Sequence, residues 1–198
     1  MSTVARPAIT ANDLLQMPDG DRFELVDGEL VEREMGSLAS WISGKAFARL
    51  DQFSEQKGGW AFPDGTAYRC YDDDPERVRK PDASYIRPGR LPGDEIPGGY
   101  ITIPPDVAVE VISPNEVYYD VEAKVEEYLD AGVPLVWLIN PDNRSVRVFR
   151  ADQPVVQLRA ADELTGDDIL PSFQCSVAEL FPPQSAVKTI PHAVRSET

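Results

Sequence analysis

The alternation of apolar and polar residues predicts a mixed α/β domain. Short apolar or alternating runs predict strands at residues 60–62, 66–71, 83–87, 106–112, 135–140, 145–150 and 155–159. Apolar residues at three- and four-residue steps predict the longest helix over 37–56 and another helix after Asn115. The strand–helix–strand order around residues 106–140, beside an antiparallel meander, indicates a central mixed sheet flanked by helices.

The N-terminal region carries two local signals. Thr10 and Asp13 have the spacing of a capping box that opens a short helix. Further along, Asp27-Gly28 separates the runs FELV and ELVE, which is a strong signal for a β-hairpin. In the register that this turn sets, Glu24 lies opposite Val31.

The domain boundaries follow from length and composition. A chain of 198 residues suits one compact domain. We predict a loose arm over 1–9, a single domain over 10–181 and a loose tail over 182–198. Within the domain, the Gly- and Pro-rich stretch 87–105 predicts a long connection without regular structure.

One buried strand contains a carboxylate that needs a partner. The run 106–112 is rich in β-branched residues, yet Glu110 lies inside it, on the face opposite Val107, Val109 and Val111. An unpaired buried carboxylate costs several kcal/mol, so we expect a cation, a basic side chain or water beside it. In the following helix Lys124 falls at the edge of the apolar stripe and could reach the strand. The alternatives are a structural role for Glu110 and a surface ion pair between Lys124 and Asp120.

Composition narrows the function classes. The formal net charge of −15 repels phosphate backbones unless a basic patch or a divalent cation intervenes. The only histidine, His192, lies in the tail, which argues against a catalytic triad and a His-rich zinc site. Cys70 and Cys175 lack CxxC spacing and are predicted to be reduced thiols. No run is long enough for a membrane span and no signal-peptide core is visible, so we predict a cytoplasmic protein.

A second unusual acid, Asp82, lies in Lys80-Pro81-Asp82 at the start of a predicted strand. If this strand neighbours the one with Glu110, the two carboxylates converge. Two carboxylates beside a lysine are typical of a Mg²⁺ or Mn²⁺ site that also uses substrate phosphate. Asp82 could instead be an ordinary turn residue.

Together these features resemble the Uma family of the PD-(D/E)xK nuclease superfamily. The resemblance is carried by FELVDGEL with Glu24, by Pro81-Asp82, by VEVISP with Glu110, by Lys124 before Tyr128, and by Gly-Val-Pro before VWLIN. It implies a restriction-endonuclease-like core and an endonuclease that hydrolyses DNA, acting as a homodimer because cutting two strands uses two sites. It further implies Asp82 and Glu110 as metal ligands, Glu24 as an accessory acid and Lys124 as the catalytic lysine.

Two departures from the family pattern favour an alternative function. Ile112 occupies the position two residues after Glu110 where the lysine normally lies, and the segment 35–41 lacks a histidine that family members often carry. The alternative is therefore a catalytically inactive protein of the same fold that serves as a binding or regulatory module.

Other charged and aromatic residues have simpler interpretations. Five basic residues near Asp82 in the sequence are candidates for a phosphate-contacting patch, with a solvated face as the alternative: Arg77, Arg79, Lys80, Arg87 and Arg90. The three tryptophans, Trp41, Trp60 and Trp137, are predicted to belong to the core. The acidic run 72–74 is predicted to be a solvated loop, because no EF-hand spacing surrounds it.

Overall fold

The structure is a computed structural model that describes residues 9–33, 35–113 and 118–187. Most of the predicted arm (1–9), the end of the predicted tail with His192, and the predicted strand break at Pro114-Asn115 lie outside the described residues. Within the described residues, no helix has the length and apolar character needed to cross a membrane.

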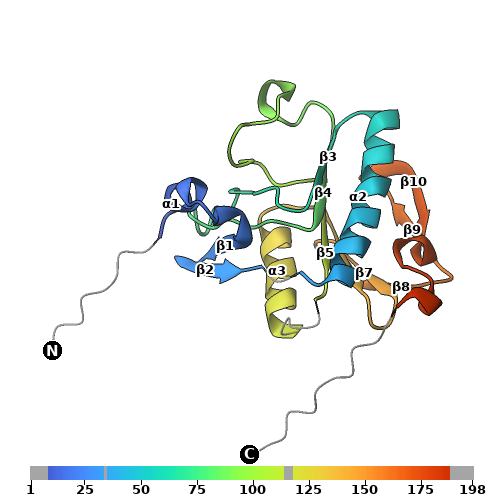
Figure 1. Ribbon diagram of the computed structural model, residues 1–198. Helices are drawn as coiled ribbons and strands as arrows, with labels where there is room; N and C mark the ends of the chain where they lie inside the picture. The colour runs from blue at the N-terminus through green and yellow to red at the C-terminus, as the bar shows by residue number, and fades with distance from the viewer. Residues whose placement is uncertain (1–8, 34, 114–117, 188–198) are drawn as a thin grey trace, which may run out of the picture.

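A six-stranded mixed sheet forms the centre of the fold, as the sequence predicts (Figure 1). Strands β5 and β6 run parallel, and every other neighbouring pair is antiparallel. In spatial order the strands are β3 (Trp60–Pro63), β4 (Ala83–Ile86), β5 (Val107–Val111), β6 (Leu135–Asn140), β7 (Ser145–Phe149) and β8 (Val156–Arg159).

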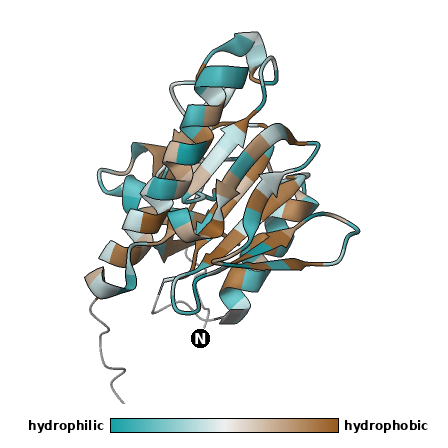
Figure 2. Ribbon diagram, turned by 90° about the vertical axis from the view of Figure 1, so that its right-hand side faces the viewer, coloured by the Kyte–Doolittle hydropathy of each residue, from teal (hydrophilic) through white to brown (hydrophobic). Residues whose placement is uncertain are grey.

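Helices cover both faces of this sheet. The long helix α2 (Ser37–Lys57) and the hairpin of β9 (Glu163–Gly166) and β10 (Leu170–Ser176) share one apolar cluster with Val109 and Trp137. On the opposite face, α3 (Tyr118–Asp130) packs against Ala108 and Leu138. Figure 2 shows the resulting concentration of hydrophobic residues on the sheet strands. Because both faces are covered, the central strands are buried along their whole length.

The alternation of side chains along β5 determines the face of the sheet on which Glu110 lies. Val107, Val109 and Val111 belong to the cluster on the α2 face, whereas Ala108 belongs to the cluster under α3. Side chains alternate along a strand, so Glu110 lies on the α3 face with Ala108. The helix that follows β5 therefore determines what Glu110 contacts.

The N-terminal hairpin pairs β1 (Phe23–Val26) with β2 (Glu29–Glu32) in the predicted register, with Glu24 opposite Val31. Its turn uses positive φ values at Asp27 (51°) and Gly28 (78°), as a tight two-residue turn requires. Before it, α1 (Ala11–Gln16) begins with the predicted capping box of Thr10. Backbone hydrogen bonds between Leu25 and Val78 attach the hairpin to the rest of the fold.

Several predictions about local structure were wrong. The segment 66–71 is not a strand; within it only Tyr68 forms isolated bridges. The hairpin β9–β10 was not predicted, because its pairing contains a register irregularity between Leu170 and Gln174 that breaks the simple alternation. Trp41 is 41% exposed and not part of the core, whereas Trp60 is half-buried and packs against a core cluster, and Trp137 is buried in the core as predicted.

Short elements and thiols complete the description. Cys70 and Cys175 are free thiols, in agreement with the prediction. The 3-10 turns are Gly20–Arg22, Pro92–Asp94, Val177–Leu180 and Gln184–Ala186.

Candidate active site

The pairing of β4 with β5 brings the two predicted metal ligands together. Ala83 pairs with Val109, and this antiparallel register places the preceding residue, Asp82, opposite Glu110. Two hydrogen bonds hold the end of the strand: the Asp82 amide donates to the Val109 carbonyl at 2.9 Å, and the Val111 amide donates to the side-chain oxygen Oδ2 of Asp82 at 2.7 Å. Residues directly opposite each other on paired strands project to the same face. Both carboxylates, each at most 5% exposed, therefore lie on the α3 side of the sheet.

Lys124 of α3 supplies the cation that Glu110 requires. Its Nζ lies 3.4 Å from Glu110 Oε2 and 3.3 Å from Glu24 Oε2, and its side chain is 13% exposed. Lys124 therefore points into the protein, whereas Asp120 is exposed. The alternative of a surface ion pair between Lys124 and Asp120 is wrong. Burial opposes the charge of the ammonium, but the facing carboxylates of Glu110 and Glu24 outweigh it and raise the pKa of Lys124.

Glu24 is the most completely paired acid in the site. Its Oε1 accepts a hydrogen bond from the Lys80 amide at 2.7 Å, and its Oε2 accepts one from Arg79 at 3.0 Å. Arg79 in turn donates to both carboxylate oxygens of Glu127, at 2.7 and 2.8 Å. Burial would raise the pKa of Glu24, but Lys124 and Arg79 outweigh burial and lower the pKa to about 2. Glu24 is therefore held as an anion that helps to fix Lys124.

In contrast to Glu24, the two candidate metal ligands, Asp82 and Glu110, have raised pKa values. Burial, followed by the charge of Glu110, raises the pKa of Asp82 well above its usual range. Burial also raises the pKa of Glu110, against the opposing effect of Lys124. Their local cations thus leave part of the negative charge uncompensated, and a further cation would stabilise both ionised groups.

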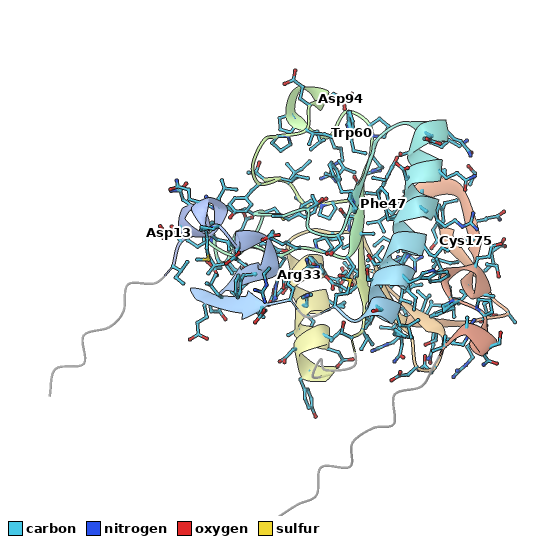
Figure 3. All side chains as sticks on the ribbon, viewed as in Figure 1. Asp13, Arg33, Phe47, Trp60, Asp94 and Cys175 are labelled. Carbon is cyan, nitrogen blue, oxygen red and sulfur yellow. The ribbon has the colours of Figure 1, made fainter. Side chains whose placement is uncertain are left out.

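Two side chains at the site were not predicted. Arg33 donates to Asp82 Oδ1 at 3.2 Å and also pairs with Asp64; Figure 3 labels it beside the hairpin. Tyr128 donates its hydroxyl hydrogen to Glu110 Oε1 at 2.6 Å. Nothing in the sequence marks Arg33, which follows the hairpin in a charged stretch. Tyr128 was named as part of the family motif that follows Lys124, with no role assigned to its hydroxyl.

The predicted basic patch does not exist as an exposed surface. Arg77, Arg79 and Lys80 are at most 8% exposed, and Arg77 and Arg79 pair with acidic side chains. Arg87 and Arg90 both contact the buried carboxylate of Asp106, at 2.6 and 2.8 Å. Burial makes both sequence interpretations, the phosphate-contacting patch and the solvated face, wrong for Arg77, Arg79 and Lys80. Arg87 and Arg90 pair with Asp106 but keep 47% and 32% of their side chains exposed.

The donor set at Asp82 and Glu110 fits a hard divalent cation. Both ligands offer only oxygen, and each carboxylate oxygen retains lone-pair directions beyond its present hydrogen bond. Among the described residues, no three His, Cys, Asp or Glu side chains form a group that could hold a metal ion. Two carboxylates completed by water and substrate phosphate are the usual mode for Mg²⁺, which seldom uses an all-protein cage.

Comparison with known proteins gives the family. A family model described as "Uma2: Putative restriction endonuclease" matches residues 11–178. The chain belongs to this family. A solved structure of "a putative nuclease belonging to DUF820" from Anabaena variabilis is similar to it, with a TM-score of 0.73 and 22% sequence identity, over 87% of this chain and 97% of that chain. That likeness shows the fold, as predicted. No curated protein matches the chain.

In this Uma2 family member, the position of the usual lysine is filled by a packing residue. Ile112 contributes to the cluster under α3, and its amide donates to the Ile139 carbonyl at 2.9 Å. Lys124 reaches Glu110 from the helix instead, which places an ammonium group beside the carboxylate from another element.

Tyr128 is expected to stabilise Glu110 measurably. Replacing it with phenylalanine keeps the ring but leaves the buried Glu110 oxygen without this donor, so the free energy of unfolding should fall by about 2 kcal/mol in urea denaturation. Tyr71→Phe is the matched control, because its buried hydroxyl has no hydrogen-bond partner among the described residues. Equal losses in the two variants would show that the Tyr128 hydroxyl does not stabilise Glu110.

Proposed function

We propose that this chain is a Mg²⁺- or Mn²⁺-dependent endonuclease that hydrolyses DNA phosphodiester bonds. The observation that carries the proposal is the set formed by Asp82, Glu110 and Lys124: two buried carboxylates side by side, with an ammonium 3.4 Å from one of them. Membership of the Uma2 family supports it.

The roles of the residues follow from their charges. Asp82 and Glu110 would hold the divalent ion, which polarises the scissile phosphate and acidifies a bound water. Lys124 would orient that water or stabilise the negative charge that develops on the phosphate. Glu24, fixed by Arg79, would keep the Lys124 ammonium in place.

The acidic surface sets a condition on DNA binding. A net charge of −15 repels the phosphate backbone, so local cations must outweigh it at the site. Arg33 and Lys124, which lie within 3.5 Å of site carboxylates, would act together with the divalent ion. Cleavage of both strands would take two copies of the chain, which supports a homodimer as the acting form.

Metal titration and plasmid nicking on the same samples test this proposal. Wild-type protein is expected to bind Mn²⁺ and Mg²⁺ by calorimetry and to nick plasmid DNA, and Asp82→Asn/Glu110→Gln should lose both. Asp19→Asn/Glu55→Gln removes the same two charges from exposed positions and should retain both. A wild-type protein without metal binding would overturn the enzyme proposal. Metal binding without nicking would instead favour the binding or regulatory module.

Metal affinity is expected to rise with pH. Because the pKa values of Asp82 and Glu110 are raised, protons compete with the metal for these carboxylates up to a higher pH than at ordinary carboxyl groups. Affinity for Mn²⁺ should therefore increase by up to about tenfold per pH unit for each proton released, until both groups are ionised. Calorimetry in buffers of different ionisation enthalpy counts these protons. A pH-independent affinity without proton release would contradict Asp82 and Glu110 as the ligands.

A further inference from the structure

A pocket of about 540 Å³ adjoins the candidate active site. It lies between α1 and the connection from β4 to β5, which Figure 1 shows on the same side of the molecule. Its size falls in the range of small-molecule sites. The side chains that define its chemistry are Leu15, Met17, Phe62, Lys80, Ile96 and Tyr100.

A buried ammonium lies among the lining residues. Lys80 is 4% exposed, and its Nζ donates to the carbonyl oxygens of Gly20 at 2.7 Å and Asp21 at 3.1 Å. Within the described part of the chain, no carboxylate forms an ion pair with it. An ammonium has three donors, and carbonyl groups occupy two of them. The third N–H is available for an acceptor on a ligand.

Large apolar side chains in the pocket lining are open to solvent. Leu15 and Ile96 are 53% and 55% exposed, and both line the pocket. The ring of Tyr100 is held by a hydrogen bond from its hydroxyl to the Ala11 carbonyl at 2.7 Å. A free inorganic anion would gain nothing from these walls, and a purely apolar ligand would leave the Lys80 donor without an acceptor. A flat heterocycle with an acceptor at its edge uses both.

Residues that line the pocket are close neighbours in the chain of residues in the candidate site. Lys80 precedes Asp82 by two residues, and its own amide donates to Glu24 at 2.7 Å. On another side, the lining residue Gly65 follows Asp64, which pairs with Arg33. A group in the pocket would therefore lie next to a phosphate held at Asp82.

We infer that this pocket binds an unstacked guanine of the nucleic acid substrate, next to the scissile phosphate. The inference rests on the proposed function. Guanine presents O6 and N7 as adjacent acceptors that the one remaining N–H of Lys80 can share, whereas adenine places an amino donor beside N7, which the ammonium repels. The apolar walls replace the stacking that the base loses when it leaves the duplex.

Nucleotide binding without metal tests the pocket separately from cleavage. Wild-type protein in a chelator is titrated with dGMP, dAMP and deoxyribose 5-phosphate, with binding followed by NMR. The dGMP is expected to bind about tenfold more tightly than dAMP, and the sugar phosphate should bind most weakly. Leu15→Asp should weaken dGMP binding about tenfold, whereas Val155→Asp, which charges an equally exposed apolar position on another edge, should not.

Two results would overturn the inference. One is equal binding of dGMP and deoxyribose 5-phosphate, and the other is unchanged dGMP binding in Leu15→Asp. Lys80→Met should remove the preference for dGMP over dAMP if it folds, and Leu15→Asp keeps the test decisive if it does not. This assay needs neither metal nor cleavage. Guanine can therefore bind to a protein that does not nick DNA, and a protein that nicks DNA can fail to bind guanine, so the two proposals fail independently.

Discussion

Replacing Lys124 with methionine is expected to lower the free energy of unfolding by about 3–5 kcal/mol. The substitution preserves the length and helix propensity of the side chain but removes the cation shared by Glu24 and Glu110. Glu24 keeps Arg79 and the Lys80 amide as partners, whereas among the described residues Glu110 keeps only the hydroxyl of Tyr128 as a hydrogen-bond donor. The cost therefore arises mainly from a buried Glu110 without a counter-charge. Urea denaturation at neutral pH measures it.

Two further variants separate this effect from a general effect of losing a lysine. Lys45→Met, at an exposed position of α2 where the ammonium lies 5.0 Å from the centre of the Trp41 ring, should lower stability by no more than about 1 kcal/mol. Adding Glu110→Gln to Lys124→Met should recover part of the lost stability, because it removes the buried carboxylate that has no counter-charge. If Lys124→Met costs no more than Lys45→Met, the ammonium does not neutralise the buried carboxylates.

The second large effect concerns the dependence of stability on pH. The pKa of Glu24 is lowered from 4.5 to about 2 in the folded protein, so the ionised group stabilises the fold above pH 4.5. This contribution, about 3 kcal/mol, is lost as the pH falls from 4.5 towards 2. Glu24→Gln should therefore be less stable than wild type by about that amount at pH 7, and the difference should shrink as the pH falls.

The comparison of the two proteins measures the effect of the Glu24 charge. The raised pKa values of Asp82 and Glu110 act in the opposite direction, since their contribution is lost as pH rises. Both proteins share the shift of Asp82, whereas the part of the Glu110 shift that the charge of Glu24 causes is absent from Glu24→Gln. Urea denaturation from pH 3 to 7 gives the difference at each pH. Glu29→Gln, in the same hairpin but exposed, is the matched control. A difference between wild type and Glu24→Gln that stays constant with pH would show that Glu24 is not held as an anion.

The sequence predicted the parts of the site that depend on local periodicity. The alternation in 106–112 placed Glu110 on a different face from the valines, and the helical stripe placed Lys124 within reach. The turn at Asp27-Gly28 fixed the hairpin register and thereby the position of Glu24. These features need only the geometry of one element, which the residues in that element determine.

The parts that were missed or wrong depend on contacts between distant segments. Arg33 reaches Asp82 across 49 residues, and Arg79 reaches Glu24 across 55. No local pattern shows whether an arginine faces solvent or a buried carboxylate, so the five basic residues were assigned to the surface. Trp41 was wrong for a similar reason. It follows the helical period of the apolar residues in α2, yet it is 41% exposed in the folded protein.

The long separations within the site also bear on the order of folding. Glu24, Arg79 and Lys124 come from the hairpin, a loop and α3, and their contacts close loops of 55 residues or more. Closing such loops costs chain entropy that nearby contacts do not repay, so these contacts belong to slow, late steps. The charged centre would then assemble only after the sheet has formed. A nascent or partly folded chain would consequently lack the ion pairs that join Glu24 to Arg79 and Lys124.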